Sequence, residues 1–207
     1  LLMLGVEDFG LYSVVAGVVI MISFIKNALT ASVQRFLNFE LGKNNLLELS
    51  RVFSMSLNIH VIIAIIIVIL AETVGIWLLN THLTIPLERL SSSQFVYHFS
   101  VAAVFISIIT VPYNAIIIAH ERMSVYAYIS VLEVVLKLAL VLLIQWMDFD
   151  KLEMYAISLF VVTINIQSIY VLYCIHNFKE SKYFYFFDVK LFKAIISYTG
   201  WNMFGQF

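Results

Sequence analysis

The stretch ISVLEVVLKLALVLLIQW, residues 129–146, decides the fold class because it is long and apolar enough to cross a membrane as one helix. About 20 consecutive apolar residues span the hydrocarbon core of a bilayer. The stretch nevertheless contains Glu133 and Lys137, four residues apart. Counted from Ser124 at about 1.5 Å per residue, these side chains lie roughly 14 and roughly 20 Å deep. They straddle the middle of the membrane, where a charge needs a partner or a hydrated space.

The composition of the whole chain indicates an integral membrane protein. Hydrophobic residues make up 62% and charged residues 12% of the 207 residues. Soluble domains have about 45–50% apolar and about 25% charged residues, so this chain has too little polar surface for a soluble globule. A net charge of −1 gives no electrostatic support for a nucleic-acid partner. The single cysteine, Cys174, excludes an intramolecular disulfide.

Apolar runs of spanning length predict an all-α, polytopic transmembrane helical bundle with antiparallel neighbours. The runs are too long for barrel strands, which have about 10 residues and alternate in polarity. Residues 1–4 read as the end of a first span and a seventh begins near Leu191, so we expect the chain to be part of a longer protein. The second to sixth spans are predicted at residues 11–34, 52–80, 94–119, 125–147 and 152–177.

Lysine and arginine residues predict the orientation of the bundle. Eight of them follow the second, fourth and sixth spans, whereas the opposite connections contain two. The side richer in basic residues is therefore predicted to be cytoplasmic. The remaining two, Lys26 and Lys137, lie inside spans. The eight are Arg35, Lys43, Arg51, Arg122, Lys179, Lys182, Lys190 and Lys193, and the two are Arg89 and Lys151.

Polar side chains follow one face of the fifth span. Glu133 and Lys137 share that face, and Ser130 and Tyr126 extend it toward the cytoplasm. A charged side chain that faces lipid costs about 2.5–3.5 kcal/mol, so we expect this stripe to face the bundle interior. It is either a self-neutralising pair that fixes helix packing or a site for an ion or a lipid headgroup.

The second span has a similar polar face. It contains Lys26, which lies beside Asn27 and has no acidic residue within one helical turn. Lys26 either snorkels toward the cytoplasm or is an unpaired cation in a cavity, where an anionic ligand such as a phosphate would suit it. The polar face consists of Ser23, Asn27, Thr30 and Gln34.

The fourth span is interrupted by Pro112, which removes a backbone hydrogen bond and kinks the helix. Its polar face includes Thr110 and Asn114, either of which can bond the freed carbonyl. The kink is a hinge candidate, although static kinks also occur. In the sixth span, Asn165 and Gln167 are predicted to form hydrogen bonds between helices.

No motif predicts catalysis, a cofactor or a metal. The chain has no G-x-x-x-x-G-K-[ST] sequence, no metal-binding histidine spacing and no recognisable Ser-His-Asp set. The sequence AHER at 119–122 is interpreted as a turn at a helix end. Residues 61–71 are unbroken aliphatic and are predicted to face lipid. Residues 178–193 alternate lysines with aromatics, which fits either an interfacial segment or an ordinary cytoplasmic connector.

Four stretches together resemble the polysaccharide and O-antigen flippases. LGVEDFGLYSVVAG (4–17) resembles the turn after their first helix, with its L-G-x-x-x-[FY]-G-x-[YF] pattern, and QRFLNFELGKNN (34–45) resembles the loop after their second helix. VPYNAIIIAHERMSVYAYIS (111–130) and YTGWNMFG (198–205) are also similar to that family. It belongs to the multidrug/oligosaccharidyl-lipid/polysaccharide exporter superfamily.

The resemblance implies two MATE-like lobes of six helices around a central cavity. Residues 1–178 would be the first lobe, lacking most of its first helix. Residues 179–195 would be a cytoplasmic or interfacial linker, and residues 196–207 the start of the second lobe. The protein would then lie in the bacterial inner membrane.

The resemblance also implies a substrate and a mechanism. A polyprenyl-pyrophosphate-linked oligosaccharide would cross the bilayer by alternating access, with polysaccharide assembly proteins as further partners. Cationic cavity residues of such transporters meet the pyrophosphate, and by depth and charge the candidates here are Lys26, Arg35 and Lys137. Sugar hydroxyls would bind Asn27, Asn114 and Asn165.

Two alternatives stay open. A cation-coupled multidrug exporter of the same superfamily would use Glu133 as its proton or sodium site. A membrane-embedded glycan polymerase or transferase would need a catalytic cluster in an outer loop. Its candidate residues are Glu88, Arg89, Asp148, Asp150 and Glu153.

Overall fold

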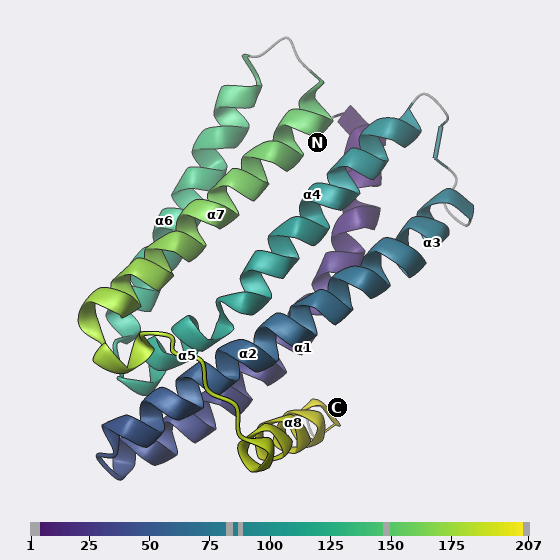
Figure 1. The fold of residues 1–207 in the computed structure, drawn as a ribbon. Coiled ribbons are helices and arrows are strands. Elements are labelled where there is room, and N and C mark those ends of the chain that lie inside the picture. The colour runs from purple at the N-terminus through teal and green to yellow at the C-terminus, as the bar shows by residue number, and fades with distance from the viewer. Residues whose placement is uncertain (1–4, 82–84, 87–88, 147–149, 205–207) are drawn as a thin grey trace.

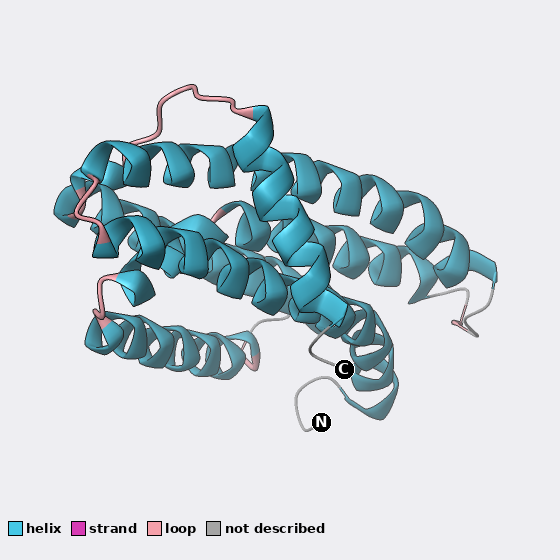
Figure 2. Cartoon of the chain, turned by 90° about the horizontal axis from the view of Figure 1, so that it is seen from below, coloured by secondary structure: helices cyan, strands magenta, loops and turns pink. Residues whose placement is uncertain are grey.

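The computed structural model is an all-helical bundle, and it describes residues 5–81, 85–86, 89–146 and 150–204 (Figure 1). Within these ranges, the side chains of residues 5–9, 11, 14–16, 18–25 and 203–204 are not described. No strand occurs in the described ranges (Figure 2). The helices are α1 (Gly5–Gly42), α2 (Leu46–Leu70), α3 (Ile76–Thr81), α4 (Leu90–Ile109), α5 (Val111–Ala119), α6 (Met123–Ile144), α7 (Lys151–Asn177) and α8 (Val189–Phe204).

The structure confirms the polytopic helical bundle predicted from the apolar runs. Among the described residues, four stretches are long and apolar enough to cross a membrane: 46–81, 90–119, 123–144 and 151–177. The predicted span at 11–34 lies within α1, a helix of 38 residues. The predicted end of a first span at residues 1–4 is outside the described residues. On the outer surface of α2, the aliphatic side chains Ile62, Ile65, Ile66, Ile69 and Leu70 are exposed, as predicted for a face that contacts lipid.

The connections predicted before and after the second span are shorter in the structure than predicted. α1 runs without a break from Gly5 to Gly42, so residues 5–10 and most of 34–45 are helical. Neither stretch contains a proline, and Glu, Leu and Phe are compatible with a helix. The turn itself is short: Asn44 has a φ of 53°, and the Asn45 side chain accepts a hydrogen bond from the Glu48 amide.

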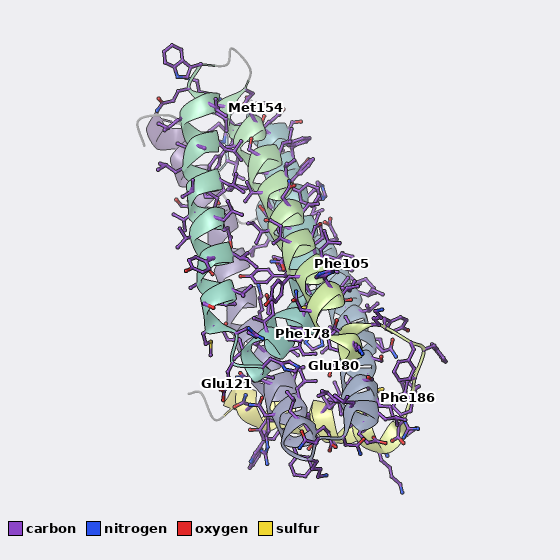
Figure 3. All side chains as sticks on the ribbon, turned by 90° about the vertical axis from the view of Figure 1, so that its left-hand side faces the viewer. Phe105, Glu121, Met154, Phe178, Glu180 and Phe186 are labelled. Atoms are coloured by element: carbon purple, nitrogen blue, oxygen red, sulfur yellow. The ribbon has the colours of Figure 1, made fainter. Side chains whose placement is uncertain are left out.

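Neighbouring spans run antiparallel, as predicted, and their connections alternate between the two ends of the bundle (Figure 1). At one end, His120 Nε2 and Glu180 Oε1 are 2.6 Å apart, and the His120 ring stacks on Phe178. Glu180 and Phe178 lie near the Glu121 turn in Figure 3, whereas Met154 marks the other end. The sequence AHER is thus a turn, as interpreted, and its histidine ties it to the segment after α7.

At the other end, Arg89 and Asp150 join the starts of α4 and α7. Their side chains form an ion pair at 2.5 Å, and the Ser92 hydroxyl donates to Glu153 at 2.8 Å. The Asp150 side chain also accepts a hydrogen bond from the backbone amide of Leu152 and so caps α7. Three of the residues considered for an outer-loop catalytic cluster are therefore engaged in structural contacts. Glu88 and Asp148 are outside the described residues.

The kink predicted at Pro112 separates α4 from α5. Thr110 ends α4, and its hydroxyl donates to the Ile106 carbonyl at 3.0 Å. The same hydroxyl lies 2.6 Å from the Gln167 side-chain amide on α7. Gln167 joins two helices, as predicted. The carbonyl that loses its donor at Pro112 is that of Ile108, four residues earlier. The predicted Thr110 bond to that carbonyl was wrong, because the hydroxyl bonds Ile106, whose carbonyl already accepts from the Thr110 amide.

The segment after α7 runs along α2 before it enters α8. The Asn58 amide donates to the Phe186 carbonyl at 2.8 Å, and the Tyr183 hydroxyl donates to Asn58 Oδ1 at 3.0 Å. α8 begins at Val189, inside the predicted linker, and continues past residue 195 into the predicted second lobe. It packs against α1 and α2 across the end of the bundle (Figure 1). The proposed division into lobe, linker and second lobe stays a prediction.

A π-helical turn, η1 (Ala71–Gly75), interrupts the helix between α2 and α3. The Tyr97 hydroxyl of α4 donates to the Ala71 carbonyl at 2.7 Å, where the regular ladder is broken. A Cβ atom on Gly75 would overlap the Tyr97 hydroxyl, and Tyr97 is buried. Glycine is therefore required here by the close approach of two helices.

Substitution Gly75→Ala is expected to destabilise the protein by about 1–3 kcal/mol, because Tyr97 must leave its place and its hydrogen bond. Thermal unfolding in detergent measures this, with Gly17→Ala as the matched control, since nothing lies within 4 Å of a Cβ at that position. The cost of Gly75→Ala should shrink in a Tyr97→Ala background. Equal costs in both backgrounds would show that Tyr97 does not impose the glycine.

Candidate functional site

An ion pair of α6 lies near a lysine of α1 within the bundle. On α6, the Lys137 ammonium donates to Glu133 Oε1 at 2.6 Å. On α1, Lys26 interacts electrostatically with both Glu133 and Lys137. The predicted i, i+4 ion pair is thus present, and a second cation from another helix accompanies it. Two cations and one carboxylate leave a formal charge of +1 at this place.

The polar stripe of α6 faces the interior of the bundle, as predicted. Its neighbour is Tyr170 of α7, which interacts electrostatically with Glu133. The Tyr126 and Tyr170 rings lie 5.9 Å apart. The stripe therefore packs on α7, whereas Val134, Leu138 and Leu142 on the opposite side of α6 are exposed.

A cavity of about 280 Å³ opens beside Lys137. The Lys137 and Glu133 side chains are 43% and 34% exposed, so neither is sealed among apolar neighbours. α1, α4, α6 and α7 all contribute walls, and the Tyr12 and Tyr155 rings meet edge to face with centroids 5.0 Å apart. Polar wall residues other than Lys137 are Tyr12, Ser100, Tyr155 and Thr163. The wall thus combines a cation with hydroxyl groups that donate and accept hydrogen bonds.

The other predicted site residues do not gather at this cavity. Arg35 lies near the end of α1, against Tyr198 of α8. Asn27 is exposed, and Asn165 is exposed and donates to Val161 of its own helix, so its predicted bond between helices was wrong. Asn114 is buried, and its side-chain oxygen has no hydrogen-bond partner in the described part of the chain.

The sequence analysis missed the contribution of α7 to the cavity wall. Tyr155 and Thr163 line the cavity, and the Tyr170 ring lies beside Tyr126 of the α6 stripe. These residues, with Leu159 between the first two, recur at spacings that place them on one helical face. That face is polar at intervals within an apolar span, which is the signal that had identified the α6 stripe. This polar pattern was not recognised in the sequence because tyrosine has an apolar ring and reads as a hydrophobic residue.

The described residues contain no group of three His, Cys, Asp or Glu side chains that could hold a metal ion. The groups that can bind a ligand at this site are its charged side chains and its hydroxyls. A site with an excess positive charge, a carboxylate that positions one cation and several hydroxyls is suited to binding an anion attached to a polar, hydroxyl-rich group.

Comparison with known protein families gives a match over nearly the whole chain. A family model described as "Polysaccharide biosynthesis protein" matches residues 2–207. Neither the curated proteins nor the solved structures contain a match to the chain.

A cysteine at position 137 is expected to react with a water-soluble thiol reagent, because Lys137 lines the cavity. Lys137→Cys should react at least tenfold faster than Leu138→Cys, the matched control at the same depth on the exposed face of α6. The native Cys174 is buried and gives little background. The measurement is the labelling rate in proteoliposomes. Equal rates at positions 137 and 138 would mean that water does not reach this part of the bundle.

Proposed function

Because the chain belongs to the polysaccharide biosynthesis protein family, we propose that it moves a lipid-linked oligosaccharide across a membrane. The family gives it a role in polysaccharide biosynthesis, and its helices make it a multi-pass membrane protein. The substrate of the proposal is a polyprenyl-pyrophosphate-linked oligosaccharide, and the membrane is the bacterial inner membrane. The protein acts as a transporter without cofactor or metal, and polysaccharide assembly proteins are its proposed partners.

The observation that carries this proposal is the charge cluster formed by Lys26, Glu133 and Lys137. Charges at this depth are expensive when they face lipid, and here Glu133 pairs with Lys137, which lines the cavity, while Lys26 lies within the electrostatic range of both. A pyrophosphate is a compact anion that a net positive site stabilises strongly where the dielectric constant is low. Glu133 holds the Lys137 ammonium in position, and Lys26 supplies positive charge that this pair does not neutralise.

The hydroxyl groups around Lys137 suit the sugar part of the substrate. Tyr12, Ser100, Tyr155 and Thr163 offer donors and acceptors next to the cation. The cavity of about 280 Å³ is near the lower end of ligand pockets, roughly 300–1,000 Å³. It would hold a headgroup or a first sugar rather than a long oligosaccharide. In the proposal, a second lobe supplies the other half of the passage, and Asn27, Asn114 and Asn165 are further candidates for sugar contacts.

The break at Pro112 suits the movement that alternating access requires. It divides one membrane span into α4 and α5, which pack against α1 on either side of the break. The missing Pro112 amide removes one backbone hydrogen bond between α4 and α5, and the Thr110 hydroxyl at the break lies 2.6 Å from Gln167 of α7. We propose this break as the hinge of the lobe.

The exporter alternative has weaker support from the geometry. A carboxylate that takes up a coupling proton or sodium ion is favoured by a site without a bound cation, whereas Glu133 already accepts from the Lys137 ammonium at 2.6 Å. An anionic substrate uses the two cations directly and leaves the carboxylate to orient one of them. The lipid-linked glycan therefore fits this cluster better than a cationic drug.

The double substitution Lys26→Ala, Lys137→Ala is expected to lower glycan export at least tenfold, because it leaves the cluster negative. The full-length protein should be tested by complementation of a flippase-deficient strain, scoring glycan at the cell surface. The control is Lys43→Ala, Lys193→Ala, which removes two exposed lysines elsewhere. Both variants must reach the membrane in equal amounts. Normal surface glycan with the double cluster variant would refute the headgroup role.

A further inference from the structure

A second cavity lies between α1 and α8, away from the charge cluster. It is a groove of about 870 Å³ in which α1 supplies a cation and α8 supplies aromatic rings. Its α1 wall lies in stretch 34–45, and its α8 wall includes Tyr198 and Trp201 of stretch 198–205, two stretches that the sequence analysis singled out separately. The residues that matter for its chemistry are Arg35, Asn38, Phe39, Ser197, Tyr198 and Trp201.

Arg35 is the cation of this groove. Its guanidinium carbon lies 4.2 Å from the centroid of the Tyr198 ring. In the described part of the chain, Arg35 forms no ion pair, whereas Arg51 and Arg89 do. Contact with a ring face uses none of the five N–H donors of a guanidinium, and these donors match two phosphate oxygens at once. Arg35 is therefore held in place and still able to bind a phosphate.

The aromatic and polar neighbours of Arg35 suit a sugar. Trp201 is 79% exposed although it belongs to an apolar helix, so its ring is open to a ligand. One face of a sugar ring carries mainly C–H groups, which lose contact with water when they pack on an aromatic ring. Asn38 and Ser197 lie in the same groove and can bond sugar hydroxyls.

The position of α8 is fixed by packing, so the groove is a built feature of the fold. Asn202 donates to the Ala28 carbonyl of α1 at 3.4 Å, and Ile195 is buried with Met55 and Ile59 of α2. The Phe36 and Tyr198 rings meet edge to face with centroids 6.1 Å apart. Together these contacts keep Tyr198 above Arg35.

The groove and the charge cluster are separate sites at different positions along α1. Nine residues divide Lys26 from Arg35, which is roughly 14 Å along a helix. Arg35 lies at the end of the bundle where the basic residues gather, near headgroup depth on the predicted cytoplasmic side. A lipid-linked substrate that is assembled on that side meets Arg35 before it meets Lys26.

We propose that this groove is the loading site for the glycosyl diphosphate head of a polyprenyl lipid. Arg35 binds the diphosphate, and Tyr198 and Trp201 pack against the first sugar. The inference rests on the proposed function, which it extends by adding a second binding site and a requirement for a sugar. An ordinary anionic phospholipid offers the same phosphate without that sugar, so binding tests can separate the two sources.

The test is equilibrium binding to the full-length protein in nanodiscs with three probes. These are a polyprenyl diphosphate bearing one hexosamine, the same lipid without sugar, and phosphatidylglycerol. Arg35→Gln should weaken binding of both diphosphates at least tenfold, whereas Arg51→Gln, a matched arginine over Phe186, should not. Trp201→Leu should remove the extra affinity of the sugar-bearing probe, whereas Trp201→Phe, which keeps an aromatic ring, should retain it. The control for Trp201→Leu is Trp146→Leu, an exposed tryptophan at the other end of the bundle.

Three outcomes would overturn the loading site: unchanged binding by Arg35→Gln, equal loss of both diphosphates with Trp201→Leu, or displacement of the diphosphates by equimolar phosphatidylglycerol. The last outcome would identify a phospholipid site. Thermal unfolding of each variant shows whether lost binding follows from misfolding. Loss of export with the Lys26, Lys137 variant alongside normal binding and export with Arg35→Gln would leave the proposed function standing and remove only the loading site. Specific binding to the groove without any glycan export would support the loading site and remove the proposed function.

Discussion

The structure depends on one constraint: inside a bilayer, every polar group must find its partner within the protein. The helical ladder is broken between α2 and α3 and between α4 and α5, and a hydroxyl lies at each break. Tyr97 donates to the Ala71 carbonyl at the first, and Thr110 donates to the Ile106 carbonyl at the second. Each hydroxyl also brings a neighbouring helix into contact, so the repair of the backbone and the packing of the bundle are the same interaction.

The same constraint separates structural charges from the candidate site. At the ends of the bundle, Arg89 pairs with Asp150 and His120 with Glu180, each joining two chain segments. Within the bundle, Glu133 pairs with Lys137, and Lys26 lies within electrostatic range without an ion pair of its own in the described residues, so neutralisation is incomplete. Net charge at this depth is costly to maintain unless water or an anion completes it. In the proposed function, this imbalance distinguishes the cluster, as a site for an anion, from the ion pairs that join two segments at the ends of the bundle.

The sequence predicted the helical class, the antiparallel order and the inward α6 stripe, because each depends on local periodicity and length. The Pro112 break was predictable for the same reason, since the cause is a single covalent ring. Helix ends were predicted less well, as the continuation of α1 through residues 5–10 shows. The partnership of Lys26 with α6 and of Arg35 with α8 was not predictable, because it depends on how helices distant in sequence pack. The sequence analysis had assigned Lys26 and Arg35 to one cavity because it could use only their depth and charge.

The two cationic sites share one continuous helix, α1. No glycine or proline occurs in α1 from residue 18 to 41, and sharp helix kinks need one of these or a comparable disruption. Lys26 and Arg35 therefore move as one body. The Pro112 break lies in the span beside α1, and Glu133 and Lys137 lie on the separate helix α6. In the proposed transport cycle, a substrate passes from the groove to the cluster as α1 shifts against α6, which changes the Lys26–Glu133 interaction while the spacing along α1 stays constant.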